Sequence, residues 1–330
     1  FLNGIEPMQR RDFLKSTALF AASALAATPS FAQSAVKDIR IGYQKTGVLA
    51  VAKGLGFLEK RFEKDGIAVK WVEFSFGPPL LEALNAGALE YGYTGDSPPI
   101  FAQAARANLL YVGAIPARGY GQAVIVLPNS PIKTVTDLKG KKVAVAKTSS
   151  AYNLLIAALE SQGLSFKDIE VAYLAPADAA AAFATGAVDA WSIWDPYFAI
   201  AEQQGKGARP LEVDRAVTAQ NSYFLGNREF TNKNPEIVKA INEEVARATQ
   251  WVNDNRDKAA QVFAEATGVS FAAQKASVDR SEYTFGPLTE TVLTQQQEVA
   301  DRFAKLGLIP KPIQVRDIVL ERQSRRLINF

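Results

Sequence analysis

Three short segments of the sequence place small and hydroxyl-bearing residues where a predicted strand passes into a predicted helix. They are residues 75–79 (SFGPP), 94–99 (TGDSPP) and 147–150 (KTSS). A helix N-terminus presents unpaired N–H groups and about half a positive charge, and small residues let an anion approach that backbone. The pattern favours a site for a tetrahedral oxyanion such as sulfonate, sulfate or phosphate. Because the same residue types commonly start helices, plain helix capping is the alternative at each junction.

Aromatic and polar residues at other predicted strand ends could complete such a site. Residues 191–197 (WSIWDPY) contain two tryptophans. Trp191 falls on the inward face of its strand and is expected in the core, whereas Trp194, at the strand end, is the better pocket candidate. Gln44 and Lys45 follow the first predicted strand and could offer an amide N–H and a positive charge to an anion.

The composition excludes several mechanisms. The 330 residues include no Cys and no His, so thiolate chemistry, Cys or His metal sites and a Ser-His-Asp triad are ruled out. No segment matches a Walker loop or a GxGxxG fingerprint, so nucleotide binding is not expected. The net charge of +3, from 37 Lys and Arg against 34 Asp and Glu, is too small to indicate nucleic-acid binding. We expect no metal and no cofactor.

The N-terminal region is typical of an export signal. Met8 is the only methionine and the expected start of the natural chain. Within residues 8–32, Arg10 and Arg11 precede an apolar stretch and a small-x-small site, and the arginine pair with the following Phe-Leu-Lys resembles a twin-arginine signal. The apolar stretch falls well short of the roughly 20 residues that span a bilayer. We therefore expect a mature, soluble periplasmic chain that begins near Gln33.

Predicted strands and helices alternate along the next part of the chain. The strands form two series, residues 39–43, 69–74, 91–93 and 110–115, then residues 123–127, 142–146, 171–174 and 190–193. Between the first two strands, residues 48–64 are predicted as a single helix. Alternation of this kind predicts a parallel sheet for each series.

The remaining chain is predicted to be mainly helical. Residues 222–226 are expected to return as a strand to the first series, and the helices that follow cover residues 235–253, 256–267, 272–280 and 290–306. We predict an α/β protein of two lobes joined by crossing strands, with a helical C-terminal section. Lobe I comprises residues 36–121 and 218–320, lobe II comprises residues 122–217, and residues 321–330 form a disordered basic tail.

Several of these segments resemble the periplasmic aliphatic sulfonate-binding proteins of ABC importers. They are residues 42–45 (GYQK), 71–74 (WVEF), 81–85 (LEALN), 94–104 (TGDSPPIFAQA), 129–135 (NSPIKTV), 137–140 (DLKG) and 190–197 (AWSIWDPY). The resemblance extends over about residues 36–320. It implies a type II periplasmic binding protein fold, capture of a small organosulfonate in the cleft between the lobes, and delivery to an ABC permease driven by its ATPase.

The residue patterns and the resemblance together predict the ligand-binding residues. The predicted set is Gln44, Lys45, Gly77, Gly95, Asp96, Ser97, Arg118, Thr148, Ser149, Ser150, Asn153, Trp194, Asp195, Tyr197 and Phe224. The resemblance places the sulfonate near Gln44 and residues 95–97 and 148–150, with an aromatic side from residues 194 and 197. Around Arg118, residues 115–122 depart from the family pattern, so this loop could tune which sulfonate tail is accepted.

Other functions stay open at this point. A binding protein for taurine, nitrate or a pyrimidine precursor would share the fold, although nitrate needs none of the apolar surface that Trp194, Tyr197 and Phe224 could provide. A pyrimidine-synthesising enzyme family of this architecture depends on His and Cys, which this chain lacks, so no enzyme is predicted. A sensor subunit that presents its ligand to a receptor is a third possibility. We expect a monomer that touches the membrane only through its transporter and binds no nucleic acid.

Overall fold

The computed structural model describes residues 36–116, 121–204, 207–218 and 220–319. The chain divides into two units, residues 1–36 and residues 37–330, and all the elements given below belong to the second. The predicted signal at residues 8–32, Arg118 and the predicted tail at residues 321–330 lie outside the described residues. Among the helices that are described, none has both the length and the apolar character needed to cross a membrane.

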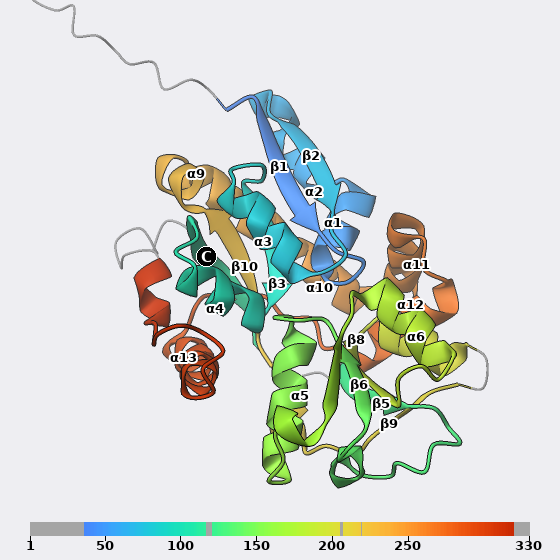
Figure 1. The fold of residues 1–330 in the computed structure, drawn as a ribbon. Helices are drawn as coiled ribbons and strands as arrows, with labels where there is room; N and C mark the ends of the chain where they lie inside the picture. Colours follow the sequence, from blue (N-terminus) through green and yellow to red (C-terminus); the bar gives the residue numbers. More distant parts are fainter. Residues whose placement is uncertain (1–35, 117–120, 205–206, 219, 320–330) are drawn as a thin grey trace, which may run out of the picture. The chain divides into compact units, whose positions relative to one another are not determined.

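The first lobe is built on a five-stranded sheet (Figure 1). Its strands are β1 (Asp38–Tyr43), β2 (Ala68–Glu73), β3 (Tyr91–Gly95), β4 (Leu109–Ile115) and β10 (Ser222–Asn227), in the order β2-β1-β3-β10-β4. β1 pairs in parallel with β2 and β3, as the alternating pattern predicted, and its residues Ile39 and Ile41 are fully buried. β10 runs antiparallel to both neighbours, so the returning strand lies inside the sheet rather than at its edge.

Four helices belong to the same part of the chain. They are α1 (Val48–Leu55), α2 (Phe57–Phe62), α3 (Gly77–Asn85) and α4 (Ser97–Ala104). The prediction of one helix over residues 48–64 is wrong at Gly56, which separates α1 from α2. Gly56 has a φ of +66°, a left-handed conformation that ends an α-helix and that glycine adopts without steric cost. A short 3₁₀ helix, Glu63–Asp65, completes the segment.

The second lobe is built on another five-stranded sheet. Its strands are β5 (Gln122–Val126), β6 (Lys142–Val145), β7 (Glu170–Tyr173), β8 (Ala190–Trp194) and β9 (Arg209–Pro210), in the order β7-β6-β8-β5-β9. The helices α5 (Ser150–Ser161), α6 (Pro176–Ala184) and α7 (Tyr197–Gln203) accompany it. Trp191 is buried, as predicted, with its ring centroid 5.9 Å from that of Phe183. The chain therefore crosses between the lobes twice, before β5 and after β9.

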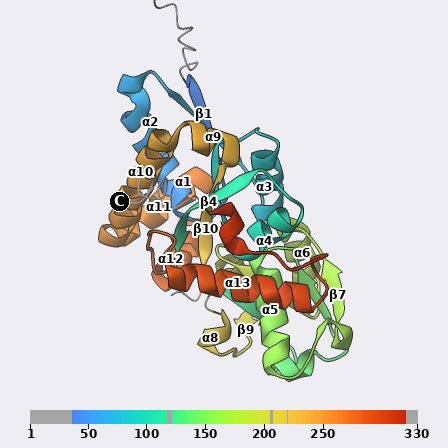
Figure 2. The ribbon, with the colours of Figure 1, turned by 90° about the vertical axis from the view of Figure 1, so that its left-hand side faces the viewer.

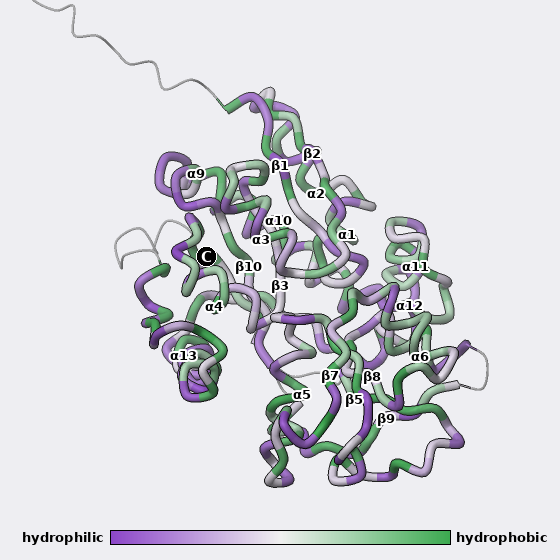
Figure 3. The backbone as a smooth tube through the Cα atoms, viewed as in Figure 1, coloured by the Kyte–Doolittle hydropathy of each residue, from purple (hydrophilic) through white to green (hydrophobic). Residues whose placement is uncertain are grey.

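The C-terminal part is helical, as predicted. Its helices are α9 (Arg228–Lys233), α10 (Pro235–Asp254), α11 (Arg256–Thr267), α12 (Phe271–Arg280) and α13 (Glu290–Lys305). The short α8 (Arg215–Thr218) comes before β10 and contacts α5 of the second lobe. α10 and α11 pack on α1, α12 contacts both α11 and α7, and α13 lies beside α4 (Figure 2). In Figure 3 polar residues gather on the peripheral α9, whereas β10 is mainly apolar. Through α12, the C-terminal section reaches a helix of the second lobe.

Candidate functional site

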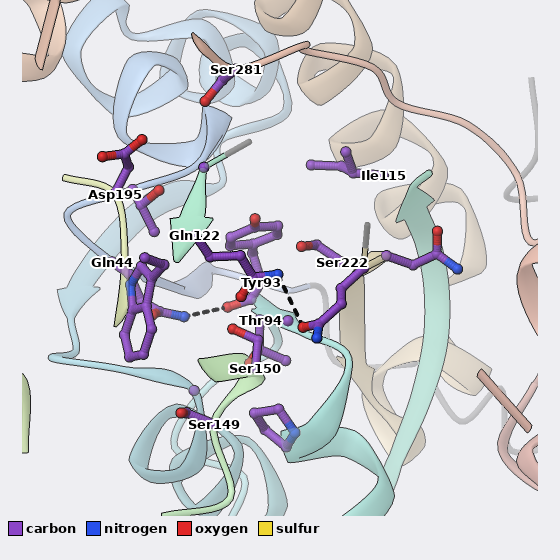
Figure 4. Close-up of a pocket in the computed structure, with 18 of the residues that line it drawn as sticks. Gln44, Tyr93, Thr94, Ile115, Gln122, Ser149, Ser150, Asp195, Ser222 and Ser281 are labelled. Atoms are coloured by element: carbon purple, nitrogen blue, oxygen red, sulfur yellow. Dashed lines mark hydrogen bonds between the residues drawn. The ribbon is translucent and has the colours of Figure 1, made fainter. Parts of the chain in front are cut away.

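A cavity of about 160 Å³ lies where strand ends of the two sheets face each other (Figure 4). Its described lining consists of Gln44, Thr46, Gly77, Tyr93, Thr94, Gly95, Pro98, Ile115, Pro116, Gly121, Gln122, Ser149, Ser150, Trp194, Asp195, Thr218, Gln220, Asn221, Ser222, Ser281 and Glu282. The carboxyl ends of strands are the usual ligand position in open α/β sheets. Because a protein cavity of roughly 150 Å³ can hold benzene, this one is large enough for a small organic molecule.

Two glycines let backbone and hydroxyl groups approach each other at the centre of the site. A Cβ added to Gly77, the first residue of α3, would lie 2.0 Å from Thr94 Oγ1. A Cβ added to Gly95, the last residue of β3, would lie 2.6 Å from Ser150 Cβ. Gly95 belongs to the first lobe and Ser150 to the second, so the lobes are in direct contact here.

Thr94 places a buried hydroxyl without a described protein partner at the cavity. It is 1% exposed, it lines the cavity, and its Oγ1 has no hydrogen-bond partner among the described residues. Buried hydroxyls in native proteins are nearly always hydrogen-bonded, because an unsatisfied one costs about 1–3 kcal/mol. A ligand oxygen in the cavity would give this hydroxyl a partner.

The start of α5 brings the third junction into the site. Ser149 Oγ donates to the carbonyl of Ala146 at 2.7 Å, and the Ser149 side chain makes no capping hydrogen bond to the first turn of α5. Ser149 and Ser150 both line the cavity. Thr148 does not; it has a φ of +60°, and its Oγ1 donates to the Lys147 carbonyl at 2.7 Å. The uncapped helix start is therefore suited to receive an anion.

Gln44 and Lys45 point to different surroundings. The Gln44 side chain is buried at the cavity, and its Nε2 donates to the Tyr93 carbonyl at 2.9 Å. Lys45 is outside the described lining, and its Nζ lies 3.9 Å from Glu73 Oε1 in a half-exposed ion pair. The positive charge that the sequence suggested at this strand end is thus directed to a carboxylate of β2.

Asp96, Ser97 and Asn153 form a buried network beside the cavity rather than part of its described lining. Asp96 accepts hydrogen bonds from Ser97 Oγ at 2.9 Å and from Asn153 Nδ2 at 2.6 Å. Asn153 Oδ1 in turn accepts from Arg302 Nη1 of α13 at 3.0 Å. Burial raises the pKa of Asp96 to about 6, although the hydrogen bonds from Asn153 and Ser97 favour its ionised form. The network ties α4 and α13 to α5 across the lobes.

Asp195 is the buried carboxyl group of the cavity. Its Oδ1 accepts from the Ala199 N–H at 3.0 Å, and its Oδ2 lies 3.4 Å from Arg280 Nε. Arg280 also forms an ion pair with Glu202 and lies over the Phe198 ring, 4.1 Å from its centroid. Burial raises the pKa of Asp195 to about 7, and the charge of Arg280 limits that rise. Arg280 thereby connects α12 to the second lobe at the edge of the site.

One aromatic residue of the predicted set lines the cavity, and two others pack against residues that line it. Trp194 lines the cavity, and Tyr197 packs edge-on against it with centroids 6.2 Å apart. Phe224 is fully buried and packs against Tyr93, a lining residue, at 5.2 Å. Tyr197 and Phe224 therefore hold the rings that face the cavity.

The structure brings about half of the predicted set into the described lining. These residues are Gln44, Gly77, Gly95, Ser149, Ser150, Trp194 and Asp195. The described lining does not include Lys45, Asp96, Ser97, Thr148, Asn153, Tyr197 and Phe224. Arg118 lies outside the described residues. Direct contact with a ligand stays a prediction for each member of the set.

The cavity also uses residues that the predicted set lacks. Thr94 belongs to the 94–99 junction, and its hydroxyl at that position could have identified it as a lining residue. Gln122 and Ser222 are the first residues of β5 and β10. Each lies next to a segment that connects the two lobes, and this position could have identified them. Ser281 and Glu282 follow α12 and reach the cavity through the tertiary placement of that helix, which no local pattern reveals. Within the described part of the chain, no cluster of three or more acidic residues could hold a metal ion.

Comparisons with known proteins show the family to which the chain belongs. Residues 44–259 match the family described as NMT1/THI5 like. The chain is 42% identical to the periplasmic aliphatic sulphonate binding protein SsuA of Escherichia coli, with a TM-score of 0.77 and coverage of 86% of this chain and 97% of that one. It is 39% identical to the alkanesulfonate-binding protein SsuA of Xanthomonas axonopodis pv. citri, solved bound to MOPS, with a TM-score of 0.81 and coverage of 86% and 98%.

A more distant relative is the taurine-binding periplasmic protein of Escherichia coli. It is 26% identical over 82% of each chain. The fold is the type II periplasmic binding protein fold that the sequence predicted, with two α/β lobes joined by crossing strands. The chain belongs to the NMT1/THI5-like family and, within it, to the aliphatic sulfonate-binding proteins.

Proposed function

We propose that this chain captures aliphatic sulfonates in the cavity between its lobes and delivers them to an ABC importer. The observation that carries the proposal is the meeting of an uncapped helix start, at α5, with the unpartnered hydroxyl of Thr94 in one cavity. The relatives named above bind sulfonates, and one of them was solved with the sulfonate buffer MOPS. Like these relatives, the chain is a binding protein and not an enzyme.

The sulfonate group would be held by hydrogen bonds without a change of protonation. A sulfonate stays ionised over the physiological pH range, so its oxygens accept hydrogen bonds at all times. The Thr94 and Ser150 hydroxyls and the N–H groups at the starts of α3 and α5 are the donors in this proposal. Because Gly95 and Ser150 come from different lobes, closure of the lobes completes the donor set around the bound ligand.

The location and partners follow from the same proposal. The chain would be exported by the signal predicted at residues 8–32 and would act in the periplasm as a monomer. A permease and its ATPase would receive the ligand, because a binding protein alone cannot move a solute across a membrane. A cavity of about 160 Å³ leaves room for an organic tail beside the sulfonate, which supports an organosulfonate over nitrate.

Replacement of Thr94 by valine tests the hydroxyl directly, because the two side chains have nearly the same shape. A hydrogen bond to a charged group contributes roughly 1.5–3 kcal/mol, so the dissociation constant for propane-1-sulfonate should rise at least tenfold in calorimetry. The ligand-free variant should unfold at the same temperature as the parent or higher, since a buried hydroxyl without a partner is removed.

Thr231→Val is the matched control. Thr231 is fully buried, its Oγ1 likewise has no partner among the described residues, and it is outside the described cavity lining. This variant should keep the parent's affinity. Equal affinity of Thr94→Val and Thr231→Val would show that the Thr94 hydroxyl does not contact the ligand.

A further inference from the structure

We propose that Arg302 of α13 is a positioning residue for the sulfonate site, although it is outside the described cavity lining. α13 packs on α4 of the first lobe, and Arg302 holds α5 of the second lobe in the orientation in which its start faces the ligand. This inference rests on the proposed function, because it assumes that the bound sulfonate lies at the start of α5. It goes further by assigning part of the affinity to a contact outside the cavity.

Arg302 contacts α5 at two points. Its Nη1 donates to Asn153 Oδ1 at 3.0 Å, and its Nε lies 3.2 Å from Glu160 Oε2. Asn153 and Glu160 lie about two turns apart along one face of α5, so a single side chain fixes both the position and the direction of the helix. The ion pair with Glu160 is partly exposed and contributes little by itself. The contact with Asn153 therefore has the larger effect.

The amide of Asn153 is held from both sides by the first lobe. Its Oδ1 accepts from Arg302, and its Nδ2 donates to Asp96 Oδ2 at 2.6 Å. The Asn153 side chain is only 2% exposed, and a buried acceptor that loses its donor is costly. Separation of the lobes would let water reach the amide and remove that cost. Loss of Arg302 therefore shifts the protein towards the open arrangement.

The same helix also positions the second partner of this amide. Gln296 of α13 is 1% exposed, and its Nε2 donates to the Asp96 carbonyl at 2.6 Å and to the Tyr111 hydroxyl at 2.9 Å. Tyr111 belongs to β4, so these bonds fix α13 and Asp96 to the sheet of the first lobe. α13 thus places both groups that hold Asn153.

The contact reaches the ligand through the start of α5. Ser149 and Ser150 line the cavity, and Asn153 follows within about one turn of the helix. The N–H groups at a helix start point along its axis, so a tilt of α5 would move them away from a sulfonate that also contacts Thr94 of the first lobe. Arg302 prevents that tilt and keeps the two parts of the donor set together.

Calorimetry with propane-1-sulfonate tests the assignment. Arg302→Leu should raise the dissociation constant about fivefold to twentyfold, because the closed arrangement loses a hydrogen bond to a buried amide. Arg316→Leu is the matched control. Arg316 forms an exposed ion pair with Glu290 at the start of the same helix, and this variant should bind as the parent does.

A double-mutant cycle shows whether Arg302 acts through Asn153. Asn153→Ala removes the acceptor, so the addition of Arg302→Leu to it should weaken binding by less than about twofold. Arg302→Gln keeps an amide donor for Asn153 and should bind more tightly than Arg302→Leu. A general loss of stability would instead multiply the effects of the two substitutions.

A distance measurement reports the arrangement of the lobes directly. The chain has no Cys, so Lys64→Cys and Lys139→Cys, at exposed positions in the first and second lobes, provide a specific pair of spin-label sites. With saturating propane-1-sulfonate, double electron–electron resonance should show a single distance in the parent. In Arg302→Leu, part of the population should keep the distance of the ligand-free protein.

The outcomes separate this inference from the proposed function. If the parent binds propane-1-sulfonate and folded Arg302→Leu binds it within twofold of the parent, the inference is wrong and the proposed function stands. Multiplied effects of Arg302→Leu and Asn153→Ala would also overturn it. If Arg302→Leu does not fold, Glu160→Lys, a half-exposed change that repels Arg302, should raise the dissociation constant, and an unchanged value would contradict the assignment. Failure of the parent to bind propane-1-sulfonate, butane-1-sulfonate and MOPS would overturn both.

Discussion

Replacement of Gly95 by alanine should weaken sulfonate binding about tenfold to a hundredfold while both lobes stay folded. The added Cβ would lie 2.6 Å from Ser150 Cβ and 3.0 Å from Ser150 Oγ, which is closer than side-chain carbons can approach. Overpacking of this kind costs roughly 1–3 kcal/mol, and each 1.4 kcal/mol is a tenfold change in affinity. Because the two residues belong to different lobes, separation of the lobes relieves the clash, and the closed state loses population.

Gly286→Ala is the matched control for this experiment. A Cβ at Gly286 meets no atom within 4 Å, so the variant should bind as the parent does. Calorimetry gives the affinities, and small-angle scattering with saturating ligand should show a larger radius of gyration for Gly95→Ala alone. Affinity within twofold of the parent in Gly95→Ala would mean that the contact with Ser150 is not part of the bound state.

Replacement of Arg280 by leucine should lower the free energy of unfolding by about 3 kcal/mol at pH 8, because it leaves the carboxylates of Asp195 and Glu202 without their shared partner. The loss should be smaller at pH 5. Burial raises the pKa of Asp195 to about 7, so the folded protein holds this group protonated at pH 5. The stability linked to that proton is present below the ordinary aspartate pKa of about 4 and is lost as the pH rises through about 7.

Urea unfolding at pH 5, 6, 7 and 8 measures the effect. The control is Arg316→Leu, which removes an ion pair to Glu290 whose side chains are 52% and 75% exposed, and which should cost at most about 1 kcal/mol. The difference between the Arg280 variant and the parent should grow with pH, whereas that of the Arg316 variant should stay nearly constant. A pH-independent loss for Arg280→Leu would show that Asp195 does not titrate in this range.

Most of the fold could be predicted because its elements have local causes. Alternating apolar strands and helices predicted the parallel pairing of β1 with β2 and β3, and helical spacing predicted the long C-terminal helices. The failure at residues 48–64 also has a local cause. Both halves of that segment favour helix, and the break depends on the left-handed backbone of one residue, Gly56. Glycine inside a helical pattern is ambiguous until its φ is known.

The site was harder to predict because contacts between residues far apart in the chain determine which side chains face the cavity. The junction at residues 94–99 was recognised, but Thr94 faces the cavity while Asp96 and Ser97 face a buried network. Strand and helix geometry turns neighbouring side chains in different directions, so composition alone does not select among them. Glu282 reaches the cavity because α12 packs against α7, and the sequence carries no signal for that contact.

The inner position of β10 constrains the order in which the protein can assemble during synthesis. A chain that leaves the ribosome N-terminus first presents β3 and β4 early, yet the strand between them ends only at Asn227. The second sheet, from β5 to β9, is complete in sequence before β10 emerges. The first sheet therefore cannot close until the whole second sheet has been translated. The predicted twin-arginine signal implies export in the folded form. If the protein is exported in this way, export can begin only after β10 has been synthesised and has paired with β3 and β4.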